Sequence, residues 1–342
     1  MPTSIKDIAK LAGVSHTTVS RALHDSPLIS SETKLRIQAI SRQTGYHPSV
    51  AARSLKTNRS QVLGVIVSHI ADPFFSEILQ GIDDVAQSNG YSLFIAAAQH
   101  DSAKEAAILQ TMREHRVDGV ILCSPQLTSE QNDQLQSFGI PIVAINNQGS
   151  NDFQYSIAHD DVDGSRQACQ HLIDLGHLRI GYLGDSTSGR TTHDRLRGYQ
   201  QVMAEHDLPV PGKFMHEASG NSAADGFASV EYFLGLEKMP TAIICYNDMV
   251  AAGVLKGLHL AGLQVPEDIS ITGFDNILYS DYTRPPLTTI DQPKRFLGAE
   301  AARLMFQQLK PNDDHTPTPP YSQKLKGRLL IRQSTAQPAK EK

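Results

Sequence analysis

From Val62 onward, the chain alternates short apolar runs with amphipathic segments, and this alternation is the feature that most limits its fold. The apolar runs are, in order, VLGVIVSHI, YSLFIAAA, GVILC and PIVAI, and then RIGYLG, TAIICY and DISITGF. The helical patterns lie near 74–88, 102–116, 128–137, 161–174, 193–206, 222–236 and 248–262. Apolar runs of this length that alternate with helices are typical of parallel sheets covered on both faces. Two successive series predict two α/β lobes, with a ligand held between them at the carboxyl ends of the strands.

Two short amphipathic helices separated by one glycine open the chain. Ser4 and Asp7 have the spacing of a capping box, and Ser15 can cap a second helix after Gly13. The polar, slightly cationic outward face of this second helix consists of His16, Thr17, Ser20 and Arg21. Such a pair is typical of a helix-turn-helix, which lays its second helix in the DNA major groove. An ordinary helical hairpin with a solvated face is the alternative interpretation.

A third helix is predicted over 31–43, and it completes one small helical core. We expect Leu35, Ala39 and Ile40 on its inward face, and Gly45 at its end. The next stretch, PSVAARSLKTNRSQ over 48–61, is basic and too polar to bury itself. So short a segment is marginal as an isolated helix, so we expect it to order only against a partner.

The charge of the chain is divided unevenly between its two parts. Residues 1–60 contain 9 Lys and Arg against 3 Asp and Glu, whereas residues 61–342 contain 22 against 33. The basic N-terminal part is therefore the candidate for binding a polyanion such as DNA. A length of 342 residues also allows two or three separate cores.

Several classes of protein are disfavoured by what the chain lacks. Cys123, Cys169 and Cys245 lie far apart among apolar residues, which predicts buried free thiols in a reducing compartment. No stretch of 18 apolar residues occurs, and no secretion signal precedes the first helix, so we expect a soluble cytoplasmic protein without membrane contact. The chain has no Gly-rich phosphate loop, no His-Glu-x-x-His pattern and no nucleophile elbow. We therefore expect no enzymatic activity, no cofactor and no metal.

The sequence resembles the lactose-repressor family of bacterial transcription regulators (LacI/GalR type) over nearly its whole length. The stretches that carry the resemblance are IKDIAKLAGVSHTTVSRAL, PSVAARSLKTNRSQVLGVIV, DPFFSEILQGI, HLIDLGHLRIGYL, RLRGYQQVM, PTAIICYNDMVAAGVL, VPEDISITGFDN and RPPLTTIDQP. A solute-binding protein of transport would share the two-lobed architecture, but it would need a signal peptide and would have no use for the first 60 residues. The resemblance therefore favours a DNA-binding regulator.

The resemblance implies two kinds of DNA contact. The start of the second helix reads operator bases, which places His16 and Thr17 at the variable base-reading positions. The linker leucine that wedges into the minor groove is matched by Leu55, and Lys56 beside it resembles the purine-repressor branch, which favours a central CpG step. Such pyrimidine–purine steps are easily unstacked and bent. The predicted DNA-contacting residues are Ser15, His16, Thr17, Thr18, Ser20, Arg21, Ala52, Leu55 and Lys56.

The resemblance also implies an effector site between the lobes. Arg195 matches the arginine that binds the ligand, and Asp275 matches the carboxylate that binds hydroxyls or ring nitrogens. Asn247 is predicted as a ligand contact, whereas Asp248 is predicted to cap the following helix. The predicted effector-binding residues are Phe74, Phe75, Asn146, Asp160, Arg195, Asn221, Asn247 and Asp275. Many relatives carry an acid in place of Asn146, and some carry a stacking aromatic in place of Asn221, so the ligand class stays open.

We therefore predict a small all-α helix-turn-helix headpiece followed by an α/β two-lobed, periplasmic-binding-protein-like core with parallel sheets. The predicted headpiece spans 1–47, the hinge helix or linker 48–60, and the effector-binding and dimerisation domain 61–342. Its N-lobe is placed at about 61–160 and 292–322, its C-lobe at about 161–291 and 323–336, and the tail from about 310 is expected to be loop-like. The predicted function is a homodimeric repressor of carbohydrate-utilisation genes, released from a palindromic operator by a sugar-like effector. A purine or nucleoside that acts as a corepressor is the alternative.

Overall fold

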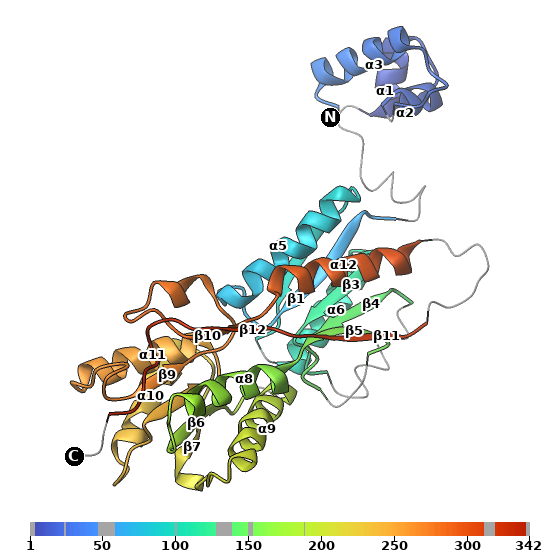
Figure 1. The fold of residues 1–342 in the computed structure, drawn as a ribbon. Helices are drawn as coiled ribbons and strands as arrows, with labels where there is room; N and C mark the ends of the chain where they lie inside the picture. The colour runs from blue at the N-terminus through green and yellow to red at the C-terminus, as the bar shows by residue number, and fades with distance from the viewer. Residues whose placement is uncertain are drawn as a thin grey trace. The chain divides into compact units, whose positions relative to one another are not determined.

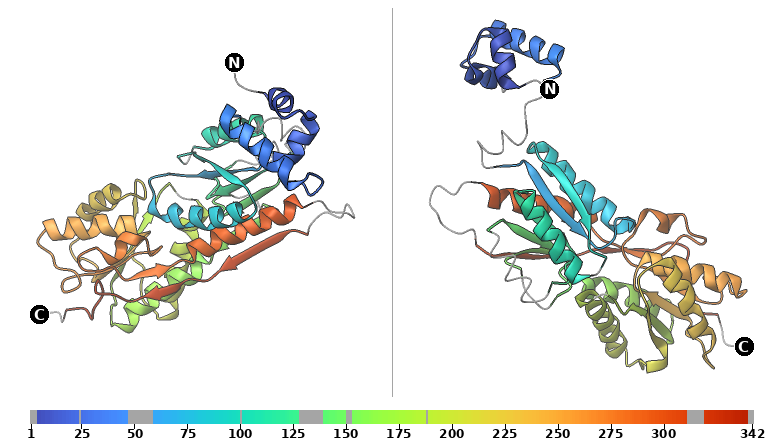
Figure 2. Two further views of the ribbon diagram at one scale, coloured as in Figure 1. Left: turned by 90° about the horizontal axis from the view of Figure 1, so that it is seen from above. Right: turned by 180° about the vertical axis from the view of Figure 1, so that it is seen from behind.

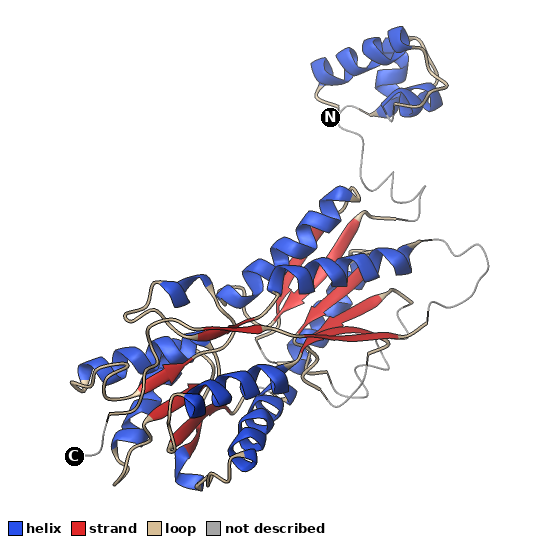
Figure 3. Ribbon diagram, viewed as in Figure 1, coloured by secondary structure: helices blue, strands red, loops and turns tan. Residues whose placement is uncertain are grey.

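The computed structural model describes residues 4–23, 25–46, 59–99, 101–127, 139–149, 153–187, 189–310 and 319–339. The chain divides into two compact units, residues 1–61 and residues 62–342 (Figure 1). In the described residues, the smaller unit contains helices but no strand, and the larger contains both helices and strands (Figure 3). Among the described residues, no helix is both long enough and apolar enough to cross a membrane.

The described part of the smaller unit, the headpiece, contains three helices. They are α1 (Ile5–Ala12), α2 (His16–Leu23) and α3 (Ser31–Thr44). The predicted capping box is present, since the Ser4 and Asp7 side chains each accept a hydrogen bond from the other residue's backbone N–H. Gly13 ends α1 with φ = 66°, a conformation that favours glycine. The Ser15 hydroxyl then caps α2 by accepting a hydrogen bond from Thr18 N at 3.1 Å. The sequence signals for both helices are therefore confirmed.

The headpiece core differs in part from the predicted inward face of α3. Its fully or nearly buried apolar residues are Ile8, Ala9, Ala12, Val19, Ala22 and Ile37. The prediction for α3 was wrong at two of its three positions, because Leu35 is 67% exposed and Ala39 is also exposed, whereas Ile40 packs against the core as predicted. Successive residues of a helix are about 100° apart, so burial of Ile37 turns Leu35 outward. Ser41 joins the buried face, where its hydroxyl donates to Tyr46 O at 2.8 Å.

The first lobe of the larger unit, the N-lobe, contains a six-stranded parallel sheet of order β11-β5-β4-β3-β1-β2. Its strands are β1 (Val62–Val67), β2 (Ser92–Ala97), β3 (Gly119–Cys123), β4 (Ile142–Ile145), β5 (Tyr155–His159) and β11 (Tyr321–Leu325). Helices α5 (Pro73–Ser88) and α12 (Lys294–Leu309) lie side by side on one face, and α6 (Ser102–Glu114) packs on β1 and β2 (Figures 1 and 2). The apolar runs of β1, β3 and β4 are therefore buried, as predicted, whereas β2 lies at the edge of the sheet and is only partly buried, with Ile95 40% exposed.

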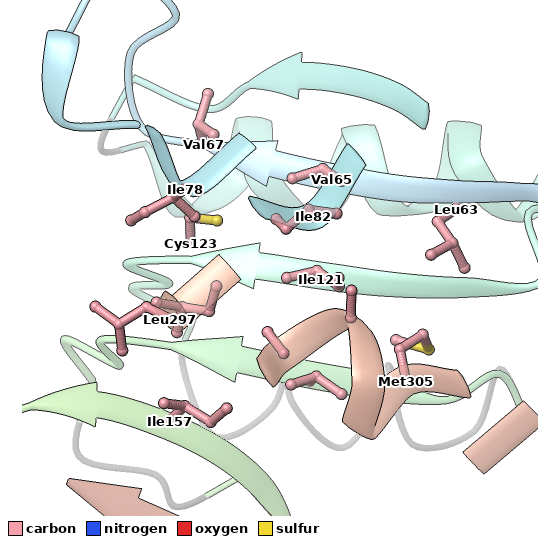
Figure 4. Close-up of a cluster of buried hydrophobic side chains, with 14 of the residues drawn as sticks. Leu63, Val65, Val67, Ile78, Ile82, Ile121, Cys123, Ile157, Leu297 and Met305 are labelled. Atoms are coloured by element: carbon pink, nitrogen blue, oxygen red, sulfur yellow. The ribbon is translucent and has the colours of Figure 1, made fainter. Parts of the chain in front are cut away.

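The core beneath α5 and α12 shows how alternate strand residues are divided between the two faces. Leu63, Val65 and Val67 of β1 point toward these helices and meet Ile78 and Leu297 there (Figure 4). The intervening Ile66 belongs to a second cluster, with Leu109 and Met112 of α6. Side chains of β1 therefore contact helices on both faces of the sheet, and this packing holds the carboxyl ends of the strands in fixed positions.

The second lobe, the C-lobe, contains a four-stranded parallel sheet of order β7-β6-β8-β9. Its strands are β6 (Ile180–Asp185), β7 (Met215–Ala218), β8 (Ala242–Cys245) and β9 (Ser270–Thr272). Its helices are α8 (Asp161–Asp174), α9 (Arg190–Glu205), α10 (Ala223–Leu234) and α11 (Asp248–Leu260). An antiparallel pair, β10 (Thr289–Asp291) and β12 (Arg328–Leu330), lies between the two sheets (Figure 1). The predicted fold class, a helix-turn-helix headpiece and a two-lobed α/β core, is thus confirmed.

The tail differs from the prediction. Residues after 310 were expected to be loop-like, but β11 and β12 are both strands. They were missed because they are polar: β11 lies at the edge of the N-lobe sheet and is largely exposed, so its sequence lacks an apolar run. The predicted helix at 128–137 lies outside the described residues.

Close packing of α5 against α12 leads to a first prediction. Gly298 lies so close to α5 that a Cβ atom there would collide with the carbonyl oxygen of Ile78. We expect Gly298→Ala to lower the free energy of unfolding by about 2 kcal/mol or more, because the two backbones would have to separate. Gly212→Ala is the matched control, since its Cβ would meet no heavy atom within 4 Å. Urea unfolding of the two variants measures the difference, and equal stability would contradict the packing.

Candidate functional site

The candidate DNA-contacting surface of the headpiece is the outward face of α2. Its side chains His16, Thr17 and Arg21 are exposed, whereas Thr18 and Ser20 are half-buried. The hydroxyls of Ser15 and Thr18 lie 2.9 Å apart, so both belong to the helix cap. The start of a helix capped in this way presents backbone N–H groups and short polar side chains together. Ala52, Leu55 and Lys56 lie outside the described residues.

The second candidate site is a cleft between the N-lobe and the C-lobe. Seven of the eight predicted effector residues line it: Phe74, Phe75, Asn146, Arg195, Asn221, Asn247 and Asp275. The remaining lining residues are Ser68, Asp72, Ser124, Gln148, Thr191 and Tyr246. Four of the lining residues directly follow strands, as the parallel sheets require: Ser68 follows β1, Ser124 follows β3, Asn146 follows β4, and Tyr246 follows β8.

Two predicted roles near the cleft were wrong. Asp160 does not line the cleft, because its carboxylate caps α8 by accepting from Asp163 N at 3.1 Å. Asn247, not Asp248, caps α11, and its side-chain oxygen accepts from Val250 N at 2.8 Å. The Asp248 carboxylate is instead buried and accepts from Ile277 N at 2.8 Å. An Asn-Asp pair at a strand end is compatible with either capping pattern, so the sequence could not decide between them.

Arg195 occupies the centre of the C-lobe wall and is only 5% exposed. Its Nε donates to Asp161 Oδ1 at 2.8 Å, and its two terminal nitrogens donate to Tyr246 O at 2.5 Å and to Asp275 Oδ1 at 3.4 Å. The guanidinium carbon also lies 3.7 Å from the centre of the Phe274 ring. Burial alone would lower the pKa of Arg195, but the carboxylates of Asp161 and Asp275 raise it above its ordinary value. The guanidinium is therefore charged and held in a fixed orientation.

The two carboxyl groups bound to Arg195 have opposite properties. Burial would raise the pKa of Asp161, but Arg195 and the neighbouring His159 together lower it below its usual value. At Asp275 burial prevails over the attraction of Arg195, and the nearby carboxylates of Asp248 and Asp72 add to it, so that the pKa rises to about 8. Burial thus favours the protonated form of Asp275, which can donate as well as accept a hydrogen bond.

The cleft residues that the sequence did not suggest have identifiable positions. Asp72 caps α5 by accepting from Phe74 N at 3.0 Å. The Gln148 side chain forms two hydrogen bonds with Thr191, at 2.7 and 3.0 Å, and so joins the N-lobe to the start of α9. Ser68, Ser124 and Tyr246 directly follow strands, so the rule used for the predicted residues would have found them. Gln148 and Thr191 carry no comparable signal.

The three cysteines are unreactive, and the described His, Cys, Asp and Glu residues form no metal site. Cys123, Cys169 and Cys245 are free and buried, as predicted, and burial raises the pKa of Cys123 and of Cys169 to about 12. Such thiols are protonated and unreactive. Within the described part of the chain, no group of three or more His, Cys, Asp or Glu residues is placed to hold a metal ion. The cleft is therefore a set of fixed hydrogen-bonding groups around a small space.

A helix-turn-helix unit joined to a two-lobed core with a polar cleft defines a class of protein, the bacterial transcription regulators with a periplasmic-binding-protein-like domain. Residues 4–49 match the model of bacterial regulatory proteins of the lacI family, and residues 169–335 match a periplasmic binding protein-like domain. The HTH-type transcriptional repressor PurR of Actinobacillus pleuropneumoniae serotype 3 (strain JL03) is 34% identical over 331 residues, 97% of this chain and 98% of the relative.

Solved structures agree with this comparison. The lac repressor dimer bound to operator and the anti-inducer ONPF matches with a TM-score of 0.86 at 26% identity, covering 98% of this chain and 100% of that one. A transcriptional regulator CelR–cellobiose complex matches with a TM-score of 0.73 at 25% identity, covering 97% and 99%. The chain belongs to the LacI family, and it is a DNA-binding transcriptional repressor.

Proposed function

We propose that this chain is a homodimeric repressor that leaves a palindromic operator when a small sugar-like effector binds in the cleft. The observation that carries the proposal is the composition of the cleft, in which ten of the thirteen lining side chains are Asp, Asn, Gln, Arg, Ser or Thr. Such groups, fixed by their own hydrogen bonds, match a ligand with many hydroxyls. Phe74, Phe75 and Tyr246 supply the apolar surface on which the face of a sugar ring can pack.

A purine or nucleoside is the second candidate effector. The relatives named PurR, such as the one from Actinobacillus pleuropneumoniae, favour this alternative because they match the chain over nearly its whole length. The cleft offers suitable partners, since a protonated Asp275 and the amides of Asn146 and Asn221 can pair with ring nitrogens and exocyclic groups. Such a ligand would act as a corepressor and would strengthen operator binding.

The small volume of the cleft supports a coupling between ligand binding in the cleft and operator binding by the headpiece. Its volume is about 50 Å³, well below the roughly 300–1,000 Å³ of typical small-molecule pockets. A ligand therefore enters only if the walls of the cleft move, and these walls belong to different lobes. In a dimer, a change in the angle between the lobes alters the distance between the two copies of Val62, where each larger unit begins. By linkage, an effector that weakens operator binding is itself bound less tightly by the DNA complex.

Exposed apolar side chains support the dimer. In the C-lobe, the short helix η2 (Leu278–Asp281) and the residue after it expose Leu278, Tyr279 and Tyr282 at 68%, 56% and 75%. Large apolar side chains grouped in this way are typical of a protein interface. We propose that a second copy of the chain covers them, so that two headpieces can bind the two halves of a palindrome.

The charge of the headpiece leads to a prediction about salt. Residues 1–60 carry 9 Lys and Arg against 3 Asp and Glu, so phosphate contacts are expected to dominate affinity. Operator affinity should fall by roughly a hundredfold or more between 50 and 200 mM salt, because bound counterions are released from the DNA. Fluorescence anisotropy with a labelled operator measures this dependence. An affinity independent of salt would contradict the electrostatic role of the headpiece.

A thermal-melt screen tests the proposed ligand class. Purified protein is heated with neutral monosaccharides and disaccharides, sugar phosphates and sugar acids, nucleosides and nucleobases, since a ligand bound only by the folded state raises the midpoint. A shift with sugars alone supports the inducer. A shift with purines alone would replace it by the corepressor alternative.

A further inference from the structure

The start of α9, a helix of the C-lobe, is capped by a residue of the N-lobe. The helix begins after Gly189, which has no side chain that could accept a hydrogen bond from the first turn. Its first two N–H groups instead bond to Gln148, which lies shortly after β4. Arg190 N donates to Gln148 O at 3.2 Å, and Thr191 N donates to Gln148 Oε1 at 3.0 Å. One lobe therefore supplies the helix cap of the other.

Further contacts join the same two segments, residues 148–149 and residues 189–191, and we call the whole set the clasp. Gln148 Nε2 donates to Thr191 Oγ1 at 2.7 Å, and Arg190 Nη2 donates to Gly149 O at 3.1 Å. A Cβ atom at Gly189 would lie 2.4 Å from Gln148 O, a distance that no side chain tolerates. The backbones of the two lobes are thus in direct contact, and only glycine permits so close an approach.

Each half of the clasp is fixed to its own lobe. In the N-lobe, Gln148 N donates to Pro125 O at 3.0 Å, and Gln148 Nε2 also donates to Asn146 O at 2.8 Å. In the C-lobe, Thr192 Oγ1 donates to the backbone oxygen of the fully buried Asp185 at 2.7 Å. Because both halves are held in this way, the clasp can open only if one lobe moves against the other.

The clasp forms part of the wall of the cleft, since Gln148 and Thr191 both line it. Next to it, Gln126 of the N-lobe donates through Nε2 to Thr187 O of the C-lobe at 3.1 Å. Thr191 is only 7% exposed and Gln148 is half-buried, so these hydrogen bonds are partly shielded from water. Every group in the clasp belongs to the chain itself, and its formation therefore needs no ligand.

We propose that the clasp keeps the two lobes closed over the cleft, and that Gln148 is the residue that positions α9 against the N-lobe. Opening of the lobes exchanges the bonds of the clasp for bonds to water and leaves the start of α9 without its cap. A molecule that enters the cleft has to open the clasp first. This last consequence rests on the proposed effector, whereas closure of the lobes by the clasp does not.

The separation of the lobes is measured by pulsed electron–electron double resonance between two nitroxide labels, with no effector added. The labels are attached through Ala103→Cys and Ala224→Cys, because both residues are exposed and lie near the starts of α6 in the N-lobe and α10 in the C-lobe. These helices follow the edge strands β2 and β7, so the labels lie at the ends of the lobes that face the cleft. Labelled protein is diluted into unlabelled protein of the same variant, so that distances within one chain dominate. The chain without the added cysteines gives the background from the three buried native thiols.

We expect one narrow distance distribution in the chain with an intact clasp. Gln148→Ala and Gly189→Ala should each add a longer distance in about a third or more of the molecules. Hydrogen exchange of the Arg190 and Thr191 amides should also become about tenfold faster, because these groups lose their partners. Two controls should match the intact chain: Gln200→Ala, on the exposed face of α9, and Gly212→Ala, whose Cβ would meet no heavy atom within 4 Å.

Unchanged distances and exchange rates in both Gln148→Ala and Gly189→Ala would overturn the inference. An intact chain that already shows mainly the longer distance would overturn it as well. Faster exchange throughout the C-lobe would count against it too, because it would indicate a general loss of stability. Since no effector is added, these outcomes are independent of the choice between a sugar and a purine, which the thermal-melt screen decides.

Discussion

Asp275→Asn is expected to abolish the response of operator binding to the effector, while operator affinity without effector stays within about threefold of wild type. The Asp275 side chain lines the cleft and lies within hydrogen-bond distance of two fixed donors, Gln292 Nε2 at 2.6 Å and an Arg195 nitrogen at 3.4 Å. Asparagine keeps the shape of the group but cannot donate from the same oxygen, so pairing with a ligand hydroxyl or ring nitrogen is lost. We expect effector affinity to fall by about a hundredfold, as measured by calorimetric titration.

The same variant has a second signature in the pH dependence of stability. Burial raises the pKa of Asp275 to about 8 and that of Asp248 to about 7, so the folded protein retains protons that the unfolded chain releases above a pH of about 4. Their contribution to stability is complete below a pH of about 4 and is lost as pH rises toward 8. Asp275→Asn should therefore flatten the fall in melting temperature between pH 6 and about 8. A response to effector that survives in Asp275→Asn would remove this side chain from the site.

Tyr282→Asp is expected to convert the repressor to monomers and to weaken operator binding by about a hundredfold or more. Tyr282 is 75% exposed beside Leu278, so a charge there costs the monomer little, but it would be buried if a second copy covered this surface. A monomer carries one headpiece and loses the gain in affinity from binding both half-sites together. Sedimentation equilibrium gives the oligomeric state, and fluorescence anisotropy gives the operator affinity.

Leu178→Asp is the matched control for the interface variant. Leu178 is also in the C-lobe and is 62% exposed, but it lies just before β6 and away in sequence from η2. It should remain dimeric and bind operator as wild type does. Dimers in both variants would contradict the proposed interface, and monomers in both would indicate a general loss of stability.

The features that were predicted correctly depend on the regular repeat of helices and strands and on local hydrogen bonds at their ends. Period and capping located α1 and α2, because Ser4, Asp7 and Ser15 satisfy specific backbone N–H groups. Uninterrupted apolar runs located the buried strands. Since parallel strands place their carboxyl ends at one edge, residues that follow strands, such as Asn146 and Asn247, were correctly placed at the cleft.

Other features depend on contacts between distant segments, and no local pattern reports them. β11 is polar because it lies at an exposed edge, and its pairing with β5 cannot be read from its own residues. Gln148 reaches the cleft from an irregular segment, where it bonds to Thr191. Leu35 points outward because of the way α3 is rotated about its own axis against α1 and α2. The apolar residues of α3 can form more than one inward face, so the sequence alone does not determine this rotation.

A titration with labelled operator shows whether a ligand in the cleft controls binding to operator DNA. An operator recovered by in vitro selection with the full-length protein is labelled, and its anisotropy is followed at a fixed protein concentration as the best ligand from the melt screen is added. We expect a sugar to release the operator from the wild-type protein and not from Asp275→Asn. Operator binding that does not change at saturating ligand, in a protein whose melting temperature the same ligand raises, would contradict it.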